Sequence, residues 1–231
     1  MYKLTLRQSA FLRIYHWLLV LLILIIVPTG FYIHKPFSFL QLDFRTLLNI
    51  HFFAGFALSY LLMARAYYAI FRQDYQTVLF TWQDFKELPA LFSYYLFFRA
   101  EKPPEQKYNA GQRLVYSLWY ISLSIANISG ALAYKKTDFL PIAKILGGVH
   151  HLDWLTLGSA LFLAYTVPLH IYLSVTENMG FSQAILTGYT YELKPDGMPP
   201  VEQGQRIKTF LPGQWLLNKL AGLVALITKE K

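Results

Sequence analysis

Apolar residues gather in four long stretches that are separated by more polar connections. The stretches cover residues 11–34, 48–71, 112–134 and 150–176, and each is near the ~20 residues that an α-helix needs to cross a bilayer. The first contains the nearly uncharged run WLLVLLILIIVPTGFYI. That run is long for a signal-peptide core and no small-residue cleavage site follows it, so we expect it to be retained. The pattern predicts an all-α membrane protein, a four-transmembrane-helix bundle.

The polar parts of the chain contain further helix candidates. The connection 73–108 includes VLFTWQDFKELPALFSYYLFF, in which clustered bulky residues are interrupted by Pro89. It predicts one or two short additional helices that lie in the membrane interface. A second interfacial candidate is GQWLLNKLAGLVALI at 213–227, which follows the turn-rich linker PDGMPP at 195–200. We therefore expect a four-helix domain over 1–190 and a cytoplasmic or interfacial C-terminal tail over 191–231.

The distribution of basic residues orients the predicted bundle. Only 15% of the residues are charged, against about 25% in an average soluble domain. With the N-terminus inside, the N-terminal segment, the 73–108 connection with its flanks and the tail hold fifteen lysines and arginines, and the two opposite connections hold five. The positive-inside rule then places both termini in the cytoplasm. The net charge of +8 is a topology signal with acidic lipid as its counter-charge, so no nucleic-acid partner is expected.

Histidines mark the ends of the apolar segments. An ionisable side chain in hydrocarbon is costly and suggests a function, and neutral imidazole is a common axial ligand of haem iron. The chain has no cysteine, which excludes haem attachment through C-x-x-C-H, cysteine-ligated iron–sulfur clusters and disulfides. Five of the six histidines lie at or near segment ends: His16, His51, His150, His151 and His170.

The depths of these histidines form two levels. The first helix runs outward and the second and fourth run inward, so His16 and His170 are near the inner face. His51 is near the outer face, together with His150 or His151. Two imidazoles at one depth on facing helices are what a bis-histidine haem requires. We expect four metal ligands, His16, His51, His151 and His170, and leave His150 as the alternative to His151. His34, beside Lys35, is expected to be interfacial.

Three arginines are candidates for contact with haem propionates. Arg13 lies one turn before His16, and Arg113 opens the third helix on the same side. Either could pair with haem propionates, because guanidinium binds carboxylates bidentately, or could be a positive-inside anchor. Arg65 lies well inside the second helix and should face the bundle, a propionate or water rather than lipid.

Short motifs in a fixed order carry a family resemblance. The motifs are RxxHW at 13–17, TG at 29–30, HFxAG at 51–55, RAYY at 65–68, YNAGQR at 108–113, HIY at 170–172 and AILTG at 184–188. They resemble the respiratory b-type cytochrome subunits that anchor formate dehydrogenase (its gamma subunit), nickel–iron hydrogenase and thiosulfate reductase in the membrane.

The resemblance implies a cytochrome with two b haems in a bacterial-type cytoplasmic membrane. His16 and His170 would hold the inner haem, and His51 would be one ligand of the outer haem. Asn109 and Gly111 match positions beside the quinone, although Asn109 could instead only cap the third helix. The partner would be an iron–sulfur or other electron-transfer subunit of an oxidoreductase on the outer side.

One position departs from the family pattern. The other outer ligand usually lies fourteen residues, or ~21 Å, before the last histidine of the fourth helix, and here that position is Thr156. His151 is nineteen residues before His170, or ~28 Å along a straight helix, and Pro168 could kink that helix. The outer haem is then either displaced or missing, and we expect a displaced haem on His51 and His151.

The function predicted from the sequence is electron transfer, without bond-making in this subunit, between an oxidoreductase partner and the quinone pool. Two alternatives belong to other classes. A haem-free membrane anchor or assembly subunit of a respiratory complex would have interfacial histidines. A small transporter would use histidines as a proton relay, but it needs a polar path, and the run LLVLLILIIV offers none.

Overall fold

Four long helices form the body of the protein. The computed structural model describes residues 2–36, 42–103, 107–134, 138–176 and 179–193. The four helices are α1 Ala10–His34, α2 Phe44–Phe71, α5 Ala110–Tyr134 and α7 Val149–Thr176. All four are long and apolar enough to cross a membrane. The predicted all-α bundle is therefore confirmed, and each helix starts within four residues of its predicted position.

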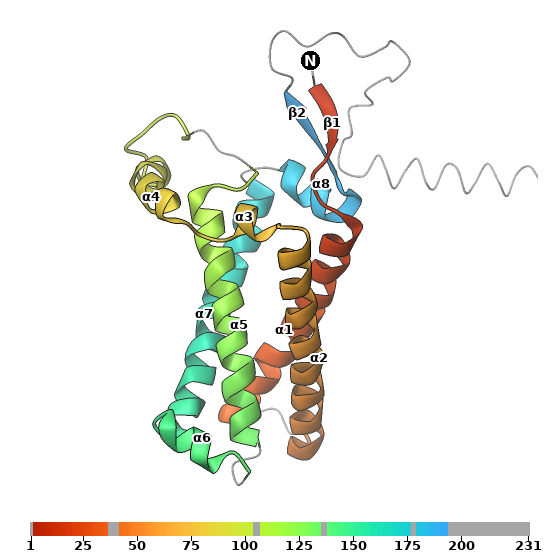
Figure 1. The fold of residues 1–231 in the computed structure, drawn as a ribbon, viewed down its shortest axis with the longest axis vertical. Coiled ribbons are helices and arrows are strands. Elements are labelled where there is room, and N and C mark those ends of the chain that lie inside the picture. Colours follow the sequence, from red (N-terminus) through yellow and green to blue (C-terminus); the bar gives the residue numbers. More distant parts are fainter. Residues whose placement is uncertain (1, 37–41, 104–106, 135–137, 177–178, 194–231) are drawn as a thin grey trace, which may run out of the picture.

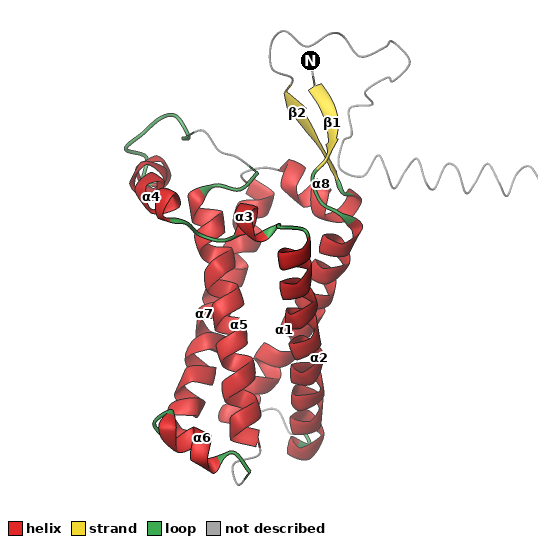
Figure 2. Cartoon of the chain, viewed as in Figure 1, coloured by secondary structure: helices red, strands yellow, loops and turns green. Residues whose placement is uncertain are grey.

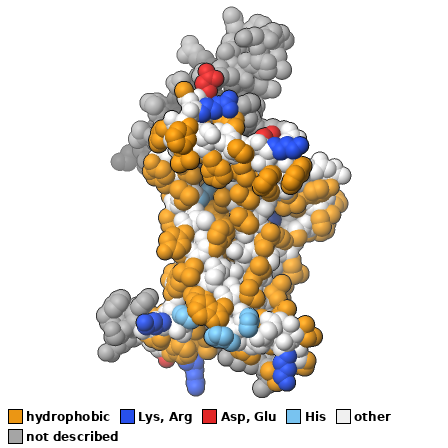
Figure 3. Space-filling view, turned by 90° about the vertical axis from the view of Figure 1, so that its left-hand side faces the viewer, with side chains coloured by type: hydrophobic (Ala, Val, Ile, Leu, Met, Phe, Trp, Pro, Cys, Tyr) orange, Lys and Arg blue, Asp and Glu red, His pale blue; other side chains and the backbone are white. Residues whose placement is uncertain are grey.

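The helices pack as two pairs. α1 lies along α2 and α5 lies along α7, and contacts of α2 with α5 and of α1 with α7 join the pairs (Figure 1). Leucines from α2, α5 and α7 form the buried centre: Leu58, Leu62, Leu123 and Leu163. On the face shown in Figure 3, hydrophobic side chains cover the middle of the bundle and charged side chains lie toward its two ends.

Side-chain caps decide where the helices begin. The Asp43 carboxylate accepts from the Thr46 backbone N–H at 3.0 Å, so α2 starts at Phe44, before the apolar pattern does. Asn109 and Gln112 form a reciprocal cap: Asn109 Oδ1 accepts from Gln112 N at 2.9 Å, and Gln112 Oε1 accepts from Asn109 N at 3.1 Å. This cap starts α5 at Ala110.

The connection between α2 and α5, where one or two short helices were expected, contains α3 Tyr75–Val78 and α4 Trp82–Tyr95. Pro89 lies inside α4 and does not interrupt it, and Leu88 and Leu91 on either side of it are buried. Another side of α4 exposes Trp82, Phe85 and Phe92. An exposed apolar stripe on a short helix at the end of a membrane bundle is typical of an interfacial helix.

The ends of the bundle differ. A two-stranded antiparallel sheet, β1 Tyr2–Leu6 with β2 Tyr189–Leu193, lies at one end with α3, α4 and the helix α8 Met179–Thr187, and α6 Leu140–Ile145 lies at the other (Figures 1 and 2). We call these the N-terminal end and the α6 end. The sheet was not predicted. The expected domain boundary after residue 190 falls within β2, and the helix candidate at 213–227 lies outside the described residues.

Gly188 joins the sheet to the bundle. Its φ is +94°, and a Cβ there would lie 3.1 Å from the Gln8 carbonyl oxygen. Its own carbonyl accepts from the backbone N–H groups of Arg7 (2.8 Å) and Gln8 (3.0 Å). Only glycine combines this backbone conformation with so close an approach.

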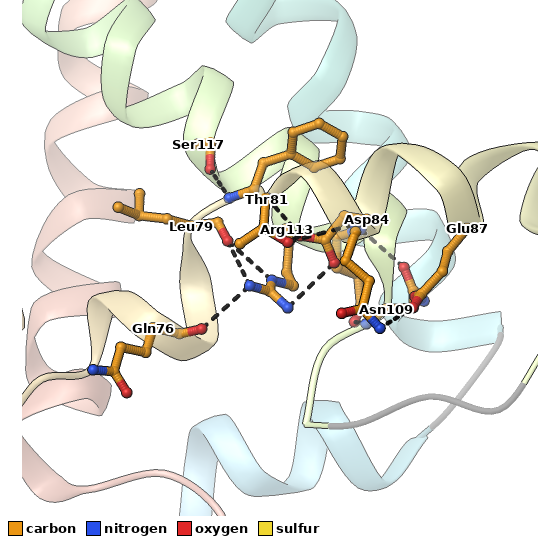
Figure 4. A network of polar contacts seen from close by, with 11 residues as sticks. Gln76, Leu79, Thr81, Asp84, Glu87, Asn109, Arg113 and Ser117 are labelled. Carbon is orange, nitrogen blue, oxygen red and sulfur yellow. Dashed lines mark hydrogen bonds and ion pairs between the residues drawn. The ribbon is translucent and has the colours of Figure 1, made fainter.

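Arg113 fastens α3 and α4 to the start of α5 (Figure 4). Its Nη1 lies 3.2 Å from Asp84 Oδ1, with both side chains largely buried. Its Nε and Nη2 donate to the Leu79 carbonyl at 3.0 and 2.7 Å, and Nη2 also donates to the Gln76 carbonyl at 3.2 Å. All three guanidinium nitrogens are thus engaged by the connection between α2 and α5.

The variant Arg113→Ala should destabilise the protein by about 3–5 kcal/mol, because it leaves the buried Asp84 carboxylate without its partner. Thermal unfolding in detergent measures the loss as a lower midpoint. The matched control is Lys86→Ala, which removes an exposed cation from the same connection. Equal midpoints for the two variants would contradict the role given to Arg113.

Candidate functional site

His16 and His170 face one another near the N-terminal end of the bundle. His16 is on α1 and His170 is on α7, both half-buried, and they are close enough to interact electrostatically. The Nδ1 atom of His16 is buried and has no hydrogen-bond partner among the described residues. A buried polar atom without a partner is costly, and here it lies where a bound ligand was predicted.

Aromatic side chains of α5 flank His170. The edges of the Trp119 and Tyr116 rings meet the imidazole at centroid distances of 5.0 and 6.3 Å. The Trp119 indole N–H donates to Thr166 Oγ1 at 2.7 Å, and the Thr166 hydroxyl donates to the Phe162 carbonyl at 2.7 Å. The indole is therefore held against His170. Sequence analysis missed both aromatic residues, although they lie one turn apart on α5.

His51 has a different setting at the other level. Its Nδ1 lies 2.9 Å from the Thr29 hydroxyl on α1. Gly30 lies against the same ring, since a Cβ on Gly30 would be 3.1 Å from His51 Cε1. The pair Thr29 and Gly30 thus brings α1 into close contact with a half-buried histidine of α2.

His150 and His151 lie at the start of α7, and both are exposed. The Nε2 atom of His150 accepts from the Trp154 indole at 2.9 Å, so one of its ring nitrogens is occupied. The His151 ring packs over Gly147. At about 100° per residue, His151 lies roughly 100° around α7 from His170 and His150 roughly 160°. His151 is therefore the nearer of the two to the face that carries His170. His34 is exposed, at the end of α1.

Hydrogen bonds between helices set their relative register, which allows the levels of the histidines to be compared. Each joins side chains, or a side chain and a carbonyl, on two different long helices. They are Thr29 with His51 (2.9 Å), Asn127 with Gly55 O (2.8 Å), Tyr120 with Leu62 O (3.3 Å), Ser129 with Thr156 (2.7 Å) and Trp119 with Thr166 (2.7 Å).

The contacts give His16 a level on α7. Neighbouring helices run in opposite directions, and the Thr29–His51 contact sets Thr29 level with His51. His16, thirteen residues before Thr29 on α1, is therefore level with residue 64, thirteen residues after His51 on α2. The Tyr120–Leu62 contact relates residue 64 to residue 118 of α5, and the Trp119–Thr166 contact relates that to residue 167 of α7. His170 is three residues further along, or ~4.5 Å.

The same count can be made for His51. The Asn127–Gly55 contact sets α2 against α5, so His51, four residues before Gly55, is level with residue 131 of α5. The Ser129–Thr156 contact in turn sets residue 131 level with residue 154 of α7. His151 lies three residues from this level, ~4.5 Å toward the α6 end. The two expected histidine pairs are therefore offset by the same amount, in opposite directions.

Thr156, at the position where the family pattern has a ligand, has a structural role. Its hydroxyl donates to the Leu152 carbonyl at 2.9 Å and shares a 2.7 Å hydrogen bond with Ser129 of α5. Ser129 is buried. The threonine thus joins α5 to α7 through a buried polar contact.

The three arginines have different partners. Arg13 donates from Nη1 to the Leu186 carbonyl at 3.0 Å, and its buried Nε has no partner among the described residues. Arg65 pairs with Asp74 at 2.5 Å, and its buried Nη1 likewise has no partner there. By the count above, Arg65 is level with residue 15 of α1, beside His16. Arg113 is engaged by α3 and α4, which favours its reading as an anchor.

Asn109 and Gly111 lie where α4 meets α5. Asn109 caps α5, as the alternative reading expected, and it also lines a cleft of about 310 Å³ with Tyr108, Asp84 and Glu87. A Cβ on Gly111 would lie 3.0 Å from Leu91 Cδ2, so the glycine allows α4 to pack on α5. The Tyr108 ring meets the Tyr116 ring at 5.4 Å, and Tyr116 in turn meets His170.

Pairs of imidazoles suit one kind of metal site. Within the described ranges, no three or more of His, Cys, Asp and Glu gather as a metal-ligand group. A haem iron takes four nitrogens from its own ring and needs only one or two axial ligands from the protein. The half-buried imidazoles of His16 and His170, and the buried guanidinium nitrogens of Arg13 and Arg65 that have no partner among the described residues, fit an imidazole-ligated group that carries carboxylates.

The fold is that of a multi-pass membrane protein with four helices that could span a bilayer. Residues 7–188 match the family described as prokaryotic cytochrome b561. The chain belongs to this family, which confirms the resemblance to respiratory b-type cytochrome membrane subunits. Membership implies haem b binding and a role in membrane electron transfer. No curated protein matches the chain.

Proposed function

We propose that the chain is the electron-transfer subunit of a membrane oxidoreductase complex, linking a partner at the outer face to the membrane quinone pool. The observation that carries the proposal is the presence of two histidine pairs, one toward each end of one four-helix bundle. A b haem held by two imidazoles supplies reversible one-electron transfer. What the chain contributes is the ligands, their spacing and the exclusion of water.

His16 and His170 are the proposed ligands of the inner haem. Their similar level in the bundle and the half-buried setting of both rings support this assignment. Arg13 and Arg65 are the proposed partners of its propionates, since each has a buried nitrogen without a hydrogen-bond partner in the described part of the chain. Guanidinium nitrogens in that position would stabilise carboxylates held out of water.

His51 and His151 are the proposed ligands of the outer haem. His151 lies three residues from the level of His51, the same offset that separates His170 from the level of His16. The alternative, His150, has one ring nitrogen hydrogen-bonded to Trp154. Thr156, at the position where the family has a ligand, hydrogen-bonds to Ser129 instead. These observations support displacement of the outer haem toward the α6 end.

The apolar centre separates the two levels. Leu58 and Leu62 of α2 lie between His51 and the level of His16, and they are buried with Leu123 and Leu163. Polar side chains lie in the same stretch, since Ser59 donates to Asn127 at 2.7 Å. The space between the levels is therefore filled by packed leucines and a few hydrogen-bonded polar groups.

The proposed quinone site is the cleft at Asn109. Tyr108 lines the cleft and connects it through the Tyr116 ring to His170. Lys107 adjoins Tyr108, with its Nζ 5.4 Å from that ring. Burial lowers the pKa of Lys107 below its ordinary value, partly offset by Asp74. A lysine whose pKa is lowered can release a proton more readily, as quinone reduction requires.

The proposed orientation places the N-terminal end in the cytoplasm of a bacterial-type cell. It rests on the excess of lysine and arginine in the segments at that end. The α6 end then faces the outer partner, an iron–sulfur or other electron-transfer subunit. Exposed Ile142, Ile145 and Leu146 at that end are available for such a contact.

His16→Ala and His170→Ala should each remove the same haem and abolish quinone-linked turnover, because both histidines are assigned to one iron. Absorption spectra of the purified variants, recorded during a redox titration, identify the component that is lost. His34→Ala, at an exposed position on α1, is the matched control and should keep both components. Loss of different components in the two variants would show that the inner pairing is wrong.

The wild-type protein should contain about two haems per chain, measured as the pyridine haemochrome against protein concentration. His51→Ala and His151→Ala should each lower the content to about one, because a bis-histidine haem is retained poorly on a single ligand. His150→Ala should leave the content unchanged. A wild-type ratio near one would remove the outer haem from the account.

Asn109→Asp should lower quinone reduction by roughly tenfold, the effect of losing one hydrogen bond of about 1–1.5 kcal/mol. The aspartate can still cap α5 but changes the donors and adds a charge in the cleft. Gln112→Glu is the matched control, since it adds the same charge to the same cap at a residue that does not line the cleft. Unchanged quinone kinetics and inhibitor affinity in Asn109→Asp would leave Asn109 as a cap only.

A further inference from the structure

The contact between Thr29 and His51 fixes which nitrogen of the imidazole carries the proton. The Thr29 hydroxyl lies 2.6 Å from the Ile25 carbonyl oxygen and 2.9 Å from His51 Nδ1. A hydroxyl has one proton, and a carbonyl can only accept. Since Thr29 donates to Ile25, it can only accept from His51. The proton of neutral His51 is therefore on Nδ1, and the lone pair is on Nε2.

Gly30 limits how the same ring can tilt. A Cβ at this position would approach His51 Cε1 to 3.1 Å, so a larger residue would force the imidazole or α1 to move. Two glycines elsewhere in the bundle provide a contrast. A Cβ added at Gly130 of α5 or Gly158 of α7 would meet nothing within 4 Å.

We propose that Thr29 and Gly30 are positioning residues that set the tautomer and the ring orientation of His51 as an axial ligand. The inference rests on the proposed function. A metal-bound histidine usually donates its second ring N–H to an acceptor, which orients the ring and makes the ligand more basic. Thr29 is such an acceptor, supplied by the neighbouring helix, and the backbone of Ile26, one turn before Gly30, also hydrogen-bonds the ring.

The two levels differ in this respect. His16 Nδ1 has no hydrogen-bond partner among the residues that the structure describes, whereas His51 Nδ1 has one. A more basic imidazole stabilises the oxidised iron. The contact between α1 and α2 therefore lowers the reduction potential at the outer level and leaves the inner level unaffected.

Thr29→Val tests the hydrogen bond, because valine keeps the shape of threonine and lacks the acceptor. The holoprotein should retain the outer haem 10- to 100-fold less tightly, the usual effect of removing such a partner. The reduction potential of the outer component should rise, and Thr29→Ser should restore both properties. Haem content after competition with apomyoglobin and a redox titration measure them, and an unchanged inner component shows that the variant is folded.

Gly30→Ala tests the ring orientation. The low-spin electron paramagnetic resonance signal of the outer component should shift, because its largest g value depends on the relative orientation of the two imidazole planes. Gly130→Ala is the matched control and should leave the signal in place.

Outer-haem retention and potential in Thr29→Val that equal those of the wild type would overturn the proposal, as would equal changes in both components. A different result addresses the proposed function itself. If His51→Ala keeps the outer component, the assignment of His51 as a ligand is wrong, whatever Thr29 does.

Discussion

The register of the four long helices is the constraint on which the rest of the structure depends. Between helices in lipid, apolar side chains gain little from leaving the surrounding hydrocarbon, so packing and polar contacts decide how the helices slide along one another. Here a few hydrogen bonds serve that purpose, among them Asn127 with Gly55 and Ser129 with Thr156. They bring histidines that are far apart in the sequence to two common levels.

The same contacts show how the proposed outer level can be kept although the family position is Thr156. Measured along α7 alone, the distance from His170 to His151 is too long for the family pattern. Measured across the bundle, His151 is offset from His51 by the same three residues that separate His170 from the level of His16. In the proposed assignment, Thr156 joins α5 to α7, and His151, one to two turns earlier, takes the ligand position nearer the surface.

The sequence predicted the bundle because its signal is local: long apolar runs, basic connections and histidines near their ends. The start of α2 was less well predicted, since the Asp43 cap adds a polar first turn that hydropathy does not detect. The pairing of β1 with β2 was missed because the strands lie at opposite ends of the described chain. Nothing local in the sequence singles out Tyr116 and Trp119, and only the packing of α5 on α7 places them against His170. The two readings of Arg113 could not be separated until its contacts with α3 and α4 were known.

The most direct test of the two-level account is a cryo-electron microscopy map of the purified protein in a lipid nanodisc. The account predicts density for two macrocycles, one bridged by His16 and His170 and the other by His51 and His151, with the leucine centre between them. A map with a single macrocycle, or with macrocycles ligated by other residues, would contradict it.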